Sequence, residues 1–343
     1  MAMAMATVDV TVMGAGIFGL AVAWACLQRG ARVQVIDPAG PGAGASGGIV
    51  GALAPHVPEQ WNAKKAFQLE SLLMARDYWA LVVEAGGGDP GYARTGRLQP
   101  LADAAAVDLA RRRIAGAEAH WQGLAVWHVT DAASHVGWAP ASGTGLYVFD
   151  SLSARIHPRR AVAALAAAIV ARGGVLRDQG PEQGAVVWAT GHAGLCAAGL
   201  GGGVKGQAAL LRHDAAAAPQ LFVDGLHIVP HADGTVAIGS TSERDWDRPD
   251  STDAALDTLI ARASSACPAL AGAPVIERWA GVRPRARSRA PLLCAWPGRP
   301  GHFIANGGFK IGFGVAPLAG EVMADLVLAG RDRIPADFKP PLP

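Results

Sequence analysis

The segment between residues 8 and 37 constrains the fold of this chain more than any other. It predicts four elements in order: a buried strand (VDVTVM, 8–13), a turn (GAGIFG, 14–19), a helix (LAVAWACLQRG, 20–30) and a second strand (RVQVID, 32–37). The turn has the spacing Gly-x-Gly-x-x-Gly. Its first glycine permits a tight turn, its second lets a pyrophosphate approach the backbone, and its third allows close helix packing. Because the phosphates would meet a helix N-terminus, the segment predicts a dinucleotide-binding site.

Asp37 adds to this prediction. It ends the second strand, 18 residues after Gly19, where its carboxylate can accept a hydrogen bond from a ribose hydroxyl. The alternative is a glycine turn without a ligand, which the surrounding strand, helix and acidic residue make the weaker interpretation.

Three further segments favour a flavin over a nicotinamide dinucleotide. GAGASGG (42–48) offers small residues and the Ser46 hydroxyl for a second approach to the pyrophosphate. VVWATG (186–191) predicts a strand that ends in small residues beneath the nucleotide. NGGFKIGFGVAP (306–317) leads a glycine-rich loop into a helix, whose N-terminal partial charge would stabilise a flavin ring as it takes up a hydride.

The rest of the chain predicts strands and helices that alternate near both ends, with hairpins in the middle. The expected helices are 64–85, 158–172, 253–266 and 315–330, and the expected strands include 174–177, 185–188, 302–308 and a hairpin at 226–241. This order predicts an α/β protein with two interleaved domains. A Rossmann-type FAD-binding domain would comprise 7–60, 151–205 and 285–332, and an antiparallel-sheet substrate domain would comprise 61–150 and 206–284.

Composition excludes several classes of protein. The 343 residues suit two domains, and 51% hydrophobic against 17% charged residues predicts a large core rather than disorder. A net charge of +2 and one dense basic run without interleaved aromatics, Arg283 to Arg289, give no reason to expect a nucleic-acid partner. The four cysteines lack CxxC spacing, which predicts neither a metal site nor a disulfide framework and suits a reducing cytoplasm.

The N-terminus is apolar enough to resemble an export signal. It lacks a basic segment, however, and the glycines at 14, 16 and 19 interrupt it at strand–turn–helix spacing. Elsewhere no uninterrupted apolar run predicts a membrane span.

Lys310 stands alone among glycines, phenylalanines and aliphatic residues. A buried ammonium needs a partner, because an unpaired one costs several kcal/mol or loses its proton. One interpretation places Lys310 on a surface loop with its head in water. The other requires an anion from outside the loop.

The chain resembles the D-amino acid oxidase superfamily of FAD-dependent oxidoreductases, above all its glycine oxidase and sarcosine oxidase branches. The resemblance covers nearly the whole chain and is best in HIVPHADGTVAIGSTSERDW, ERWAGVRPRARSRAPLL and HFIANGGFKIGFGVAPLAGEVMADLVL. It implies that Arg283, in WAGVRP, binds the substrate carboxylate and that Lys310 adds a second charge. It also places His227 where glycine oxidase has a substrate-facing tyrosine. Arg283 as part of a solvated basic strip and His227 as a strand-edge histidine remain open.

The motifs and the resemblance together give a set of expected cofactor-binding residues, and FAD is expected to be non-covalent. The set is Gly14, Gly16, Ile17, Phe18, Gly19, Asp37, Pro38, Ala45, Ser46, Gly47, Ala52, Leu53, Ala189, Thr190, Gly191, Gly307, Gly308, Phe309, Lys310, Ile311 and Gly312. Two features depart from the family. The connector 178–184 is shorter than the usual excursion on the adenine side. The flavin-linked cysteine of sarcosine oxidase has no counterpart, and Cys294 is interpreted as a core thiol.

The implied activity is oxidation of a small amino acid or N-substituted glycine by hydride transfer from Cα to the flavin. Dioxygen or a quinone would be the electron acceptor, and the sequence leaves open a homo-oligomer. Residues 44–61 also resemble the oxidase domain of a tRNA wobble-uridine-modifying enzyme, which removes a carboxymethyl group from an amine. This alternative adds His56, Lys64 and Lys65 as substrate candidates. A third alternative, a non-catalytic flavoprotein subunit, leaves Arg283 and Lys310 without a function.

Overall fold

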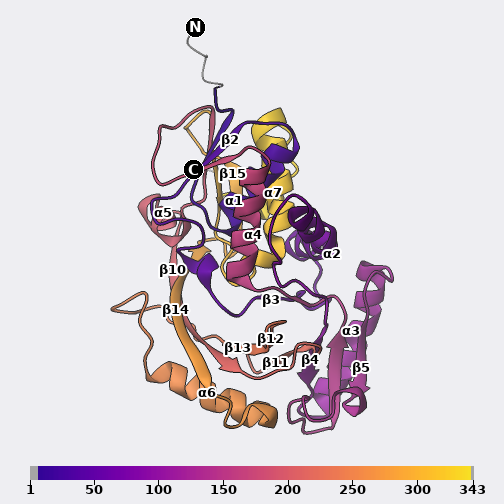
Figure 1. Cartoon of the computed structure of the whole chain (residues 1–343). Coiled ribbons are helices and arrows are strands. Elements are labelled where there is room, and N and C mark those ends of the chain that lie inside the picture. The colour runs from indigo at the N-terminus through magenta and orange to yellow at the C-terminus, as the bar shows by residue number, and fades with distance from the viewer. Residues whose placement is uncertain (1–6, 341–343) are drawn as a thin grey trace.

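The computed structural model describes residues 7–340, so the start of the apolar N-terminal stretch, residues 1–6, lies outside the described part (Figure 1). The fold contains two large sheets. The predicted α/β class, with a parallel sheet beside an antiparallel one, is confirmed.

The first sheet has six strands and is parallel except at one edge. In spatial order these are β15 (Leu292–Ala295), β16 (His302–Asn306), β9 (Ala185–Trp188), β1 (Val10–Met13), β2 (Val33–Ile36) and β8 (Val175–Arg177). Only the β15–β16 pair is antiparallel. Strands that the sequence separates by more than 100 residues, such as β1 and β9, pair directly because the chain leaves this sheet and returns to it.

Helices α1 (Ile17–Gln28), α4 (Pro158–Ala171) and α7 (Gly312–Ala329) pack together beside this sheet (Figure 1). Helix α1 is buried almost throughout, so it shows no polar face. Close contact between α1 and α7 depends on Gly320, where a Cβ would lie 2.5 Å from the Ala21 carbonyl oxygen. In the described part of the chain, α7 alone is long and apolar enough to cross a membrane. Most of it is buried against α1 and α2 (Ala63–Glu84), as core helices commonly are.

The second sheet has eight strands, antiparallel apart from the β4–β11 pair. Their order is β14 (Val275–Ala286), β10 (Gly201–Arg212), β13 (Thr235–Gly239), β12 (Leu226–Pro230), β11 (Gln220–Val223), β4 (Arg97–Pro100), β6 (Leu146–Asp150) and β5 (Trp127–Asp131). Figure 1 shows this sheet curving beneath the first, with α6 (Ala254–Ala266) on its outer side and α3 (Ala104–Trp121) beside β5.

Two smaller elements complete the fold: the two-stranded sheet of β3 (Ala52–Leu53) and β7 (Ala154–Arg155), and the short helix α5 (Gly191–Ala197). The predicted domain boundaries stay a prediction. Strand β10 runs across the expected boundary at residue 205, and α2, expected in the substrate domain, packs against α7.

Two helices begin earlier than the sequence predicts. Helix α1 starts at Ile17 rather than residue 20, and α7 starts at Gly312 rather than residue 315, with Pro317 inside it. The first turn of α1 contains Gly19 and that of α7 contains Gly312 and Gly314; glycine has low helix propensity, so the sequence predicts loops there. Tertiary packing supplies the stability that these residues lack on their own.

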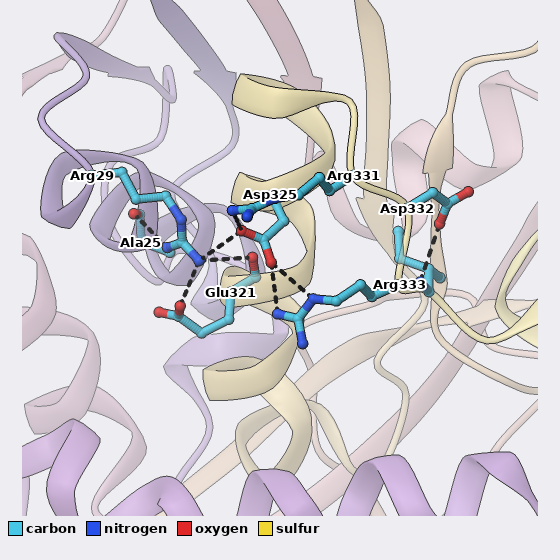
Figure 2. Close-up of polar contacts among 8 residues, drawn as sticks. Ala25, Arg29, Glu321, Asp325, Arg331, Asp332 and Arg333 are labelled. Carbon is cyan, nitrogen blue, oxygen red and sulfur yellow. Dashed lines mark hydrogen bonds and ion pairs between the residues drawn. The ribbon is translucent and has the colours of Figure 1, made fainter.

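A cluster of charges joins the distal ends of α1 and α7 (Figure 2). Asp325 of α7 is 5% exposed and pairs with three arginines. Arg29, at the end of α1, lies 3.2 Å from it, and Arg331 and Arg333, beyond α7, lie 2.9 and 2.7 Å away. Burial alone would raise the pKa of Asp325, but hydrogen bonds from Arg333 and Arg29 outweigh it and lower the pKa. The carboxylate therefore stays ionised and fully bonded.

Candidate active site

A cavity of about 820 Å³ lies where the carboxyl ends of the parallel strands face the second sheet. Its lining combines residues that follow β1, β2, β9 and β16 with residues from β4, β11, β12 and β14. In open α/β sheets, ligands bind at this end of the parallel strands. The cavity is large enough for a dinucleotide fragment together with a small substrate.

The Gly-x-Gly-x-x-Gly turn has the close approaches that its spacing predicts. Gly14 has φ of +109°, and a Cβ there would lie 2.4 Å from the Ala189 carbonyl oxygen. At Gly19 a Cβ would lie 1.9 Å from the Gly14 carbonyl oxygen. Gly14 and Gly16 line the cavity, whereas Gly19 lies behind them and sets how closely α1 meets the turn. Gly14 and Gly19 therefore exclude a side chain for geometric reasons, whereas a Cβ at Gly16 would lie 3.2 Å from Ser46 Oγ.

Three of the four α-helices whose first residues line the cavity lack a hydrogen bond from the side chain of their N-cap residue; the exception is α4, which begins at Pro158. At α1, α5 and α7 the N-cap residue makes no side-chain hydrogen bond, although Ser46 accepts from the Ile17 N–H of α1, and Ile17, Gly191 and Gly312 all line the cavity. The helices α2, α3, α4 and α6 are each capped by a side chain, from Asn62, Asp103, His157 and Asp253 respectively. N-termini without caps keep backbone N–H donors free and favour an anion. This contrast points to a negatively charged ligand in the cavity.

Two polar residues complete the nucleotide end. The Asp37 carboxylate accepts hydrogen bonds from the backbone N–H groups of Ala15 (2.8 Å) and Ala39 (3.0 Å). A carboxylate has about four acceptor positions, so it can still accept a ribose hydroxyl. The Ser46 hydroxyl accepts from Ile17 N–H at 2.9 Å, which places it directly at the start of α1. Asp37 is the only acidic residue of the lining.

The loop that carries Lys310 is held against strand β14. Phe309 N–H donates to the Pro284 carbonyl at 3.0 Å, which places the loop beside Arg283. Two cations lie near the Phe309 ring: Arg285 Cζ is 5.4 Å from its centroid and Lys310 Nζ is 5.8 Å from it. Lys310 is exposed, as the surface interpretation expects, although partial burial of its ammonium and the charges of Arg283 and Arg285 lower its pKa. Within the described residues, Lys310 has no carboxylate partner.

Arg283 lies in the cavity with neutral partners. Its Nη2 donates to Ser240 Oγ at 2.6 Å and its Nη1 to the Thr241 carbonyl at 3.3 Å. Burial lowers its pKa to about 10, so the guanidinium stays charged at neutral pH. Room for it comes from Gly206 of β10, because a Cβ there would lie 1.8 Å from Nη2. No described carboxylate pairs with it, so its charge is available to a ligand.

His227 and His56 both line the cavity. Burial, together with the charges of Arg97, Lys310 and Arg283, lowers the pKa of His227 to about 3. Its Nδ1 is buried without a partner. His56 contacts Gln68 through Nδ1 and through its backbone N–H, the latter at 2.9 Å, and burial lowers its pKa. Both imidazoles are therefore neutral at pH 7.

Most of the predicted site residues line this cavity, and the remainder lie nearby. Of the predicted cofactor set, only Gly19 and Gly47 are outside the lining. Lys64 Nζ donates to the Arg289 carbonyl (2.8 Å) and Lys65 Nζ to the Val57 carbonyl (3.0 Å), so both ammonium groups hold loops and do not line the cavity.

The two features in which the sequence differs from the family, the short connector 178–184 and the missing flavin-linked cysteine, do not alter the lining of the cavity. The connector 178–184 is bonded to the first sheet, since Gln34 Nε2 donates to the Pro181 carbonyl at 2.8 Å, and none of its residues lines the cavity. Cys294 is buried among apolar residues and its pKa is raised to about 11 by burial; no cysteine lines the cavity. In the described part, no three His, Cys, Asp or Glu residues gather as a metal site would need.

Sequence reasoning missed several lining residues outside the cofactor motifs. They are Gln68 of α2, Ser240, which follows β13, and Arg97, Phe222 and Trp279 of the second sheet. Trp279 precedes Arg283 by four residues on β14, and this even spacing on a strand was a usable signal. The others have no local motif, because contacts between segments far apart in the sequence bring them together.

A model of a protein family described as FAD dependent oxidoreductase matches residues 9–326. The chain belongs to this family. The D-amino acid oxidase resemblance and the expected FAD cofactor are thereby confirmed. Named relatives include a putative thiamine biosynthesis oxidoreductase (ThiO) of Rhizobium etli, 30% identical over 93% of this chain and 96% of its own length. The glycine oxidase of Pseudomonas aeruginosa is 34% identical over 40% of this chain, and this match spans only 38% of that protein.

Solved structures show the same fold. Glycine oxidase from Geobacillus kaustophilus superposes with a TM-score of 0.80 and 23% identity, covering 96% of this chain and 97% of its own. Iminodiacetate oxidase from Chelativorans gives a TM-score of 0.84 at 20% identity, covering 97% and 99%. None of these relatives gives support to the tRNA-modification alternative, and membership of an oxidoreductase family gives none to the non-catalytic subunit.

Proposed function

We propose that this chain is an FAD-dependent oxidase or dehydrogenase of small amino acids or N-substituted glycines. The observation that carries the proposal is Arg283: a charged guanidinium in the cavity, without a carboxylate partner among the described residues, beside a glycine-rich loop and the uncapped N-terminus of α7. Lys310 lies on that loop and adds a second positive charge. Together they suit the carboxylate of an amino acid.

The same geometry suits FAD. The glycine turn and the N-terminus of α1 would hold the pyrophosphate, Asp37 the ribose, and residues 307–312 with the N-terminus of α7 the flavin. The chemistry that bound FAD supplies is acceptance of a hydride from the substrate Cα, which leaves an imine that water hydrolyses to an amine and a keto acid or aldehyde.

The protein's own residues orient the substrate and favour the neutral form of its amine. Two cations at the carboxylate fix the position of Cα, and they disfavour a protonated amine, so they lower the pKa of the substrate amine toward the neutral form that can lose a hydride. Because His227 is neutral at pH 7, it does not act as a third cation that could bind the substrate carboxylate in place of Arg283 and Lys310. Its free Nδ1 offers one hydrogen-bonding position. Phe222, Val282 and Trp279 exclude water from the same space.

Anaerobic bleaching of the flavin tests the proposal. Purified protein should be yellow, and acid should release intact FAD because no cysteine lines the cavity. Glycine, sarcosine and D-amino acids should be offered beside ethylamine, an amine without a carboxylate. Bleaching by at least one amino acid, but not by ethylamine, is expected. Reoxidation by dioxygen or only by a quinone then separates oxidase from dehydrogenase. Protein that holds FAD but is bleached by none of the amino acids contradicts the proposal.

A further inference from the structure

Arg97 is a buried cation that the proposed reaction leaves without a role. It begins strand β4, is only 5% exposed, and lines the cavity. Its Nε donates to Asp150 Oδ2 at 2.9 Å, and Asp150 is fully buried. The other oxygen of Asp150 accepts from the Ser153 N–H, so this carboxylate is fixed behind Arg97, away from solvent.

The hydrogen bonds of Arg97 are incomplete. A guanidinium has five N–H donors, and within residues 7–340 the bond from Nε is the only one that this side chain makes. Arg155, a second buried arginine, lies outside the cavity lining; its Nη1 donates to the carbonyls of Ala216 and Pro230, and its Nε is buried without a partner. The Nη groups of Arg97 are not among the buried atoms that lack a partner, so they are open to the cavity and their N–H donors are available to a ligand there.

The position of Arg97 is separate from that of Arg283. Four strands, β11, β12, β13 and β10, lie between β4 and β14 in the second sheet. Arg97 Cζ is 5.7 Å from the Phe222 ring centroid, and that ring is 4.7 Å from the ring of His227. The charges of Arg283 and Lys310 also lower the pKa of His227, so both cations lie near its imidazole. The two cationic places therefore lie on either side of His227, facing one cavity.

The charges of the lining complete the argument. Asp37, at the nucleotide end, is the only acidic residue among them, whereas Arg97, Arg283 and Lys310 are all cationic. Asp150 balances one of these charges from behind. Arg97 keeps its Nη groups free although its charge is balanced, so it can bind a carboxylate by hydrogen bonds from the planar guanidinium.

We propose that Arg97 binds a second carboxylate of the substrate, so that the preferred substrate is an amino acid or N-substituted glycine with two carboxylates. This inference rests on the proposed function and assigns the substrate class. The carboxylate next to the reacting Cα lies on Arg283 and Lys310, and the remote carboxylate accepts hydrogen bonds from the Nη groups of Arg97. Phe222 and His227 lie along the apolar or neutral part between them.

The test uses the FAD-loaded protein and carboxylates that cannot be oxidised. Dissociation constants for acetate, malonate, succinate and glutarate are measured from changes in flavin absorbance, and checked by thermal shift. The variant is Arg97→Gln with Asp150→Asn, which replaces a net-neutral ion pair by a neutral pair and leaves no buried charge unpaired. The control is Arg94→Gln, three residues away, whose guanidinium donates to the Ser151 carbonyl and does not line the cavity.

The wild type should bind at least one dicarboxylate more tightly than acetate, by roughly tenfold to a hundredfold. The double variant should lose this preference while its dissociation constant for acetate changes less than about twofold, and Arg94→Gln should keep both values. Arg97→Lys, which keeps the charge and the pair with Asp150 but loses the planar fork, should show an intermediate preference and serves if the double variant does not fold.

Three results would overturn the inference: no preference for any dicarboxylate in the wild type, an unchanged preference in the variants, or equal weakening of acetate and dicarboxylates. Failure of the proposed function looks different. In that case no amino acid with one or two carboxylates bleaches the flavin, and acetate does not bind. Protein that oxidises monocarboxylic amino acids and binds every dicarboxylate only as it binds acetate refutes the role of Arg97 alone.

Discussion

Replacing Gly206 by alanine should displace the Arg283 guanidinium although Arg283 itself is not mutated. A Cβ at residue 206 would lie 1.8 Å from Nη2 and 2.2 Å from Cζ of Arg283, far inside contact distance. The guanidinium is the flexible end of a long side chain, so it would move and lose its bonds to Ser240 Oγ and the Thr241 carbonyl. The backbone of β10 should stay in place, since alanine suits a strand interior better than glycine.

The magnitude follows from the contact that is lost. A hydrogen bond to a charged group is worth about 1.5–3 kcal/mol, so the dissociation constant of a small carboxylate should rise roughly tenfold to 150-fold. The assay is titration of the FAD-loaded protein with acetate, and with acetamide as an uncharged ligand of the same size. Acetamide binding and FAD retention should change little.

Gly202→Ala is the matched control for this experiment. Gly202 lies on the same strand, and a Cβ there meets no atom within 4 Å. This variant should bind acetate as the wild type does. The reasoning would be refuted if Gly206→Ala bound acetate with unchanged affinity, or if it weakened acetate and acetamide equally. The first result would mean that Arg283 does not bind the carboxylate; the second would show that the whole cavity had changed.

Three other predictions concern single residues. Lys310→Met should raise the dissociation constant of acetate roughly tenfold to a hundredfold and leave that of acetamide unchanged. In a double variant with Arg283→Met, the loss of acetate binding free energy should be smaller than the sum of the two single losses, because both cations act on one anion; additive losses would contradict this. Asp37→Ala should raise the dissociation constant of FAD, measured by fluorescence recovery, while turnover at saturating FAD stays nearly intact; unchanged FAD affinity would disprove the assignment. His227 has a folded pKa near 3, below its ordinary 6.5, so the unfolded chain binds the extra proton and stability falls as the pH drops from about 6.5 toward 3, by up to about 1.4 kcal/mol per pH unit. Denaturation of His227→Gln at pH 7 and pH 5 should show a smaller difference than the wild type, and an equal difference would mean that His227 titrates normally.

The cofactor side of the cavity could be predicted because its signals are local. The turn at residues 14–19, Asp37 and the loop at 307–312 each lie within one strand–turn–helix segment, and their glycines reflect close approaches that a single segment determines. The substrate side is different. Arg283 and Lys310 entered the prediction through family resemblance, and β14 and the loop before α7 bring them together.

Arg97 and Gly206 could not have been predicted in this way. Arg97 reaches the cavity through the pairing of β4 with β11, more than 100 residues later in the chain, and a strand beginning RLQP carries no sign of that pairing. Gly206 matters only because Arg283, on the neighbouring strand β14, crosses over it. Both roles depend on strand pairing across long sequence separations, which a periodicity of two does not encode.

The charge cluster at Asp325 has a consequence for the geometry of the cofactor site. Helices α1 and α7 both direct their N-termini at the cavity, and Arg29, from the other end of α1, is bonded to Asp325. Asp325 is 13 residues from Gly312, or about 20 Å along the helix. The cluster therefore holds α1 and α7 together at their far ends, and this helps to fix the distance between their two positively polarised N-termini at the cavity. The distance between the phosphate position and the flavin position is thus set by residues that no cofactor touches, including Arg331 and Arg333 beyond the last helix.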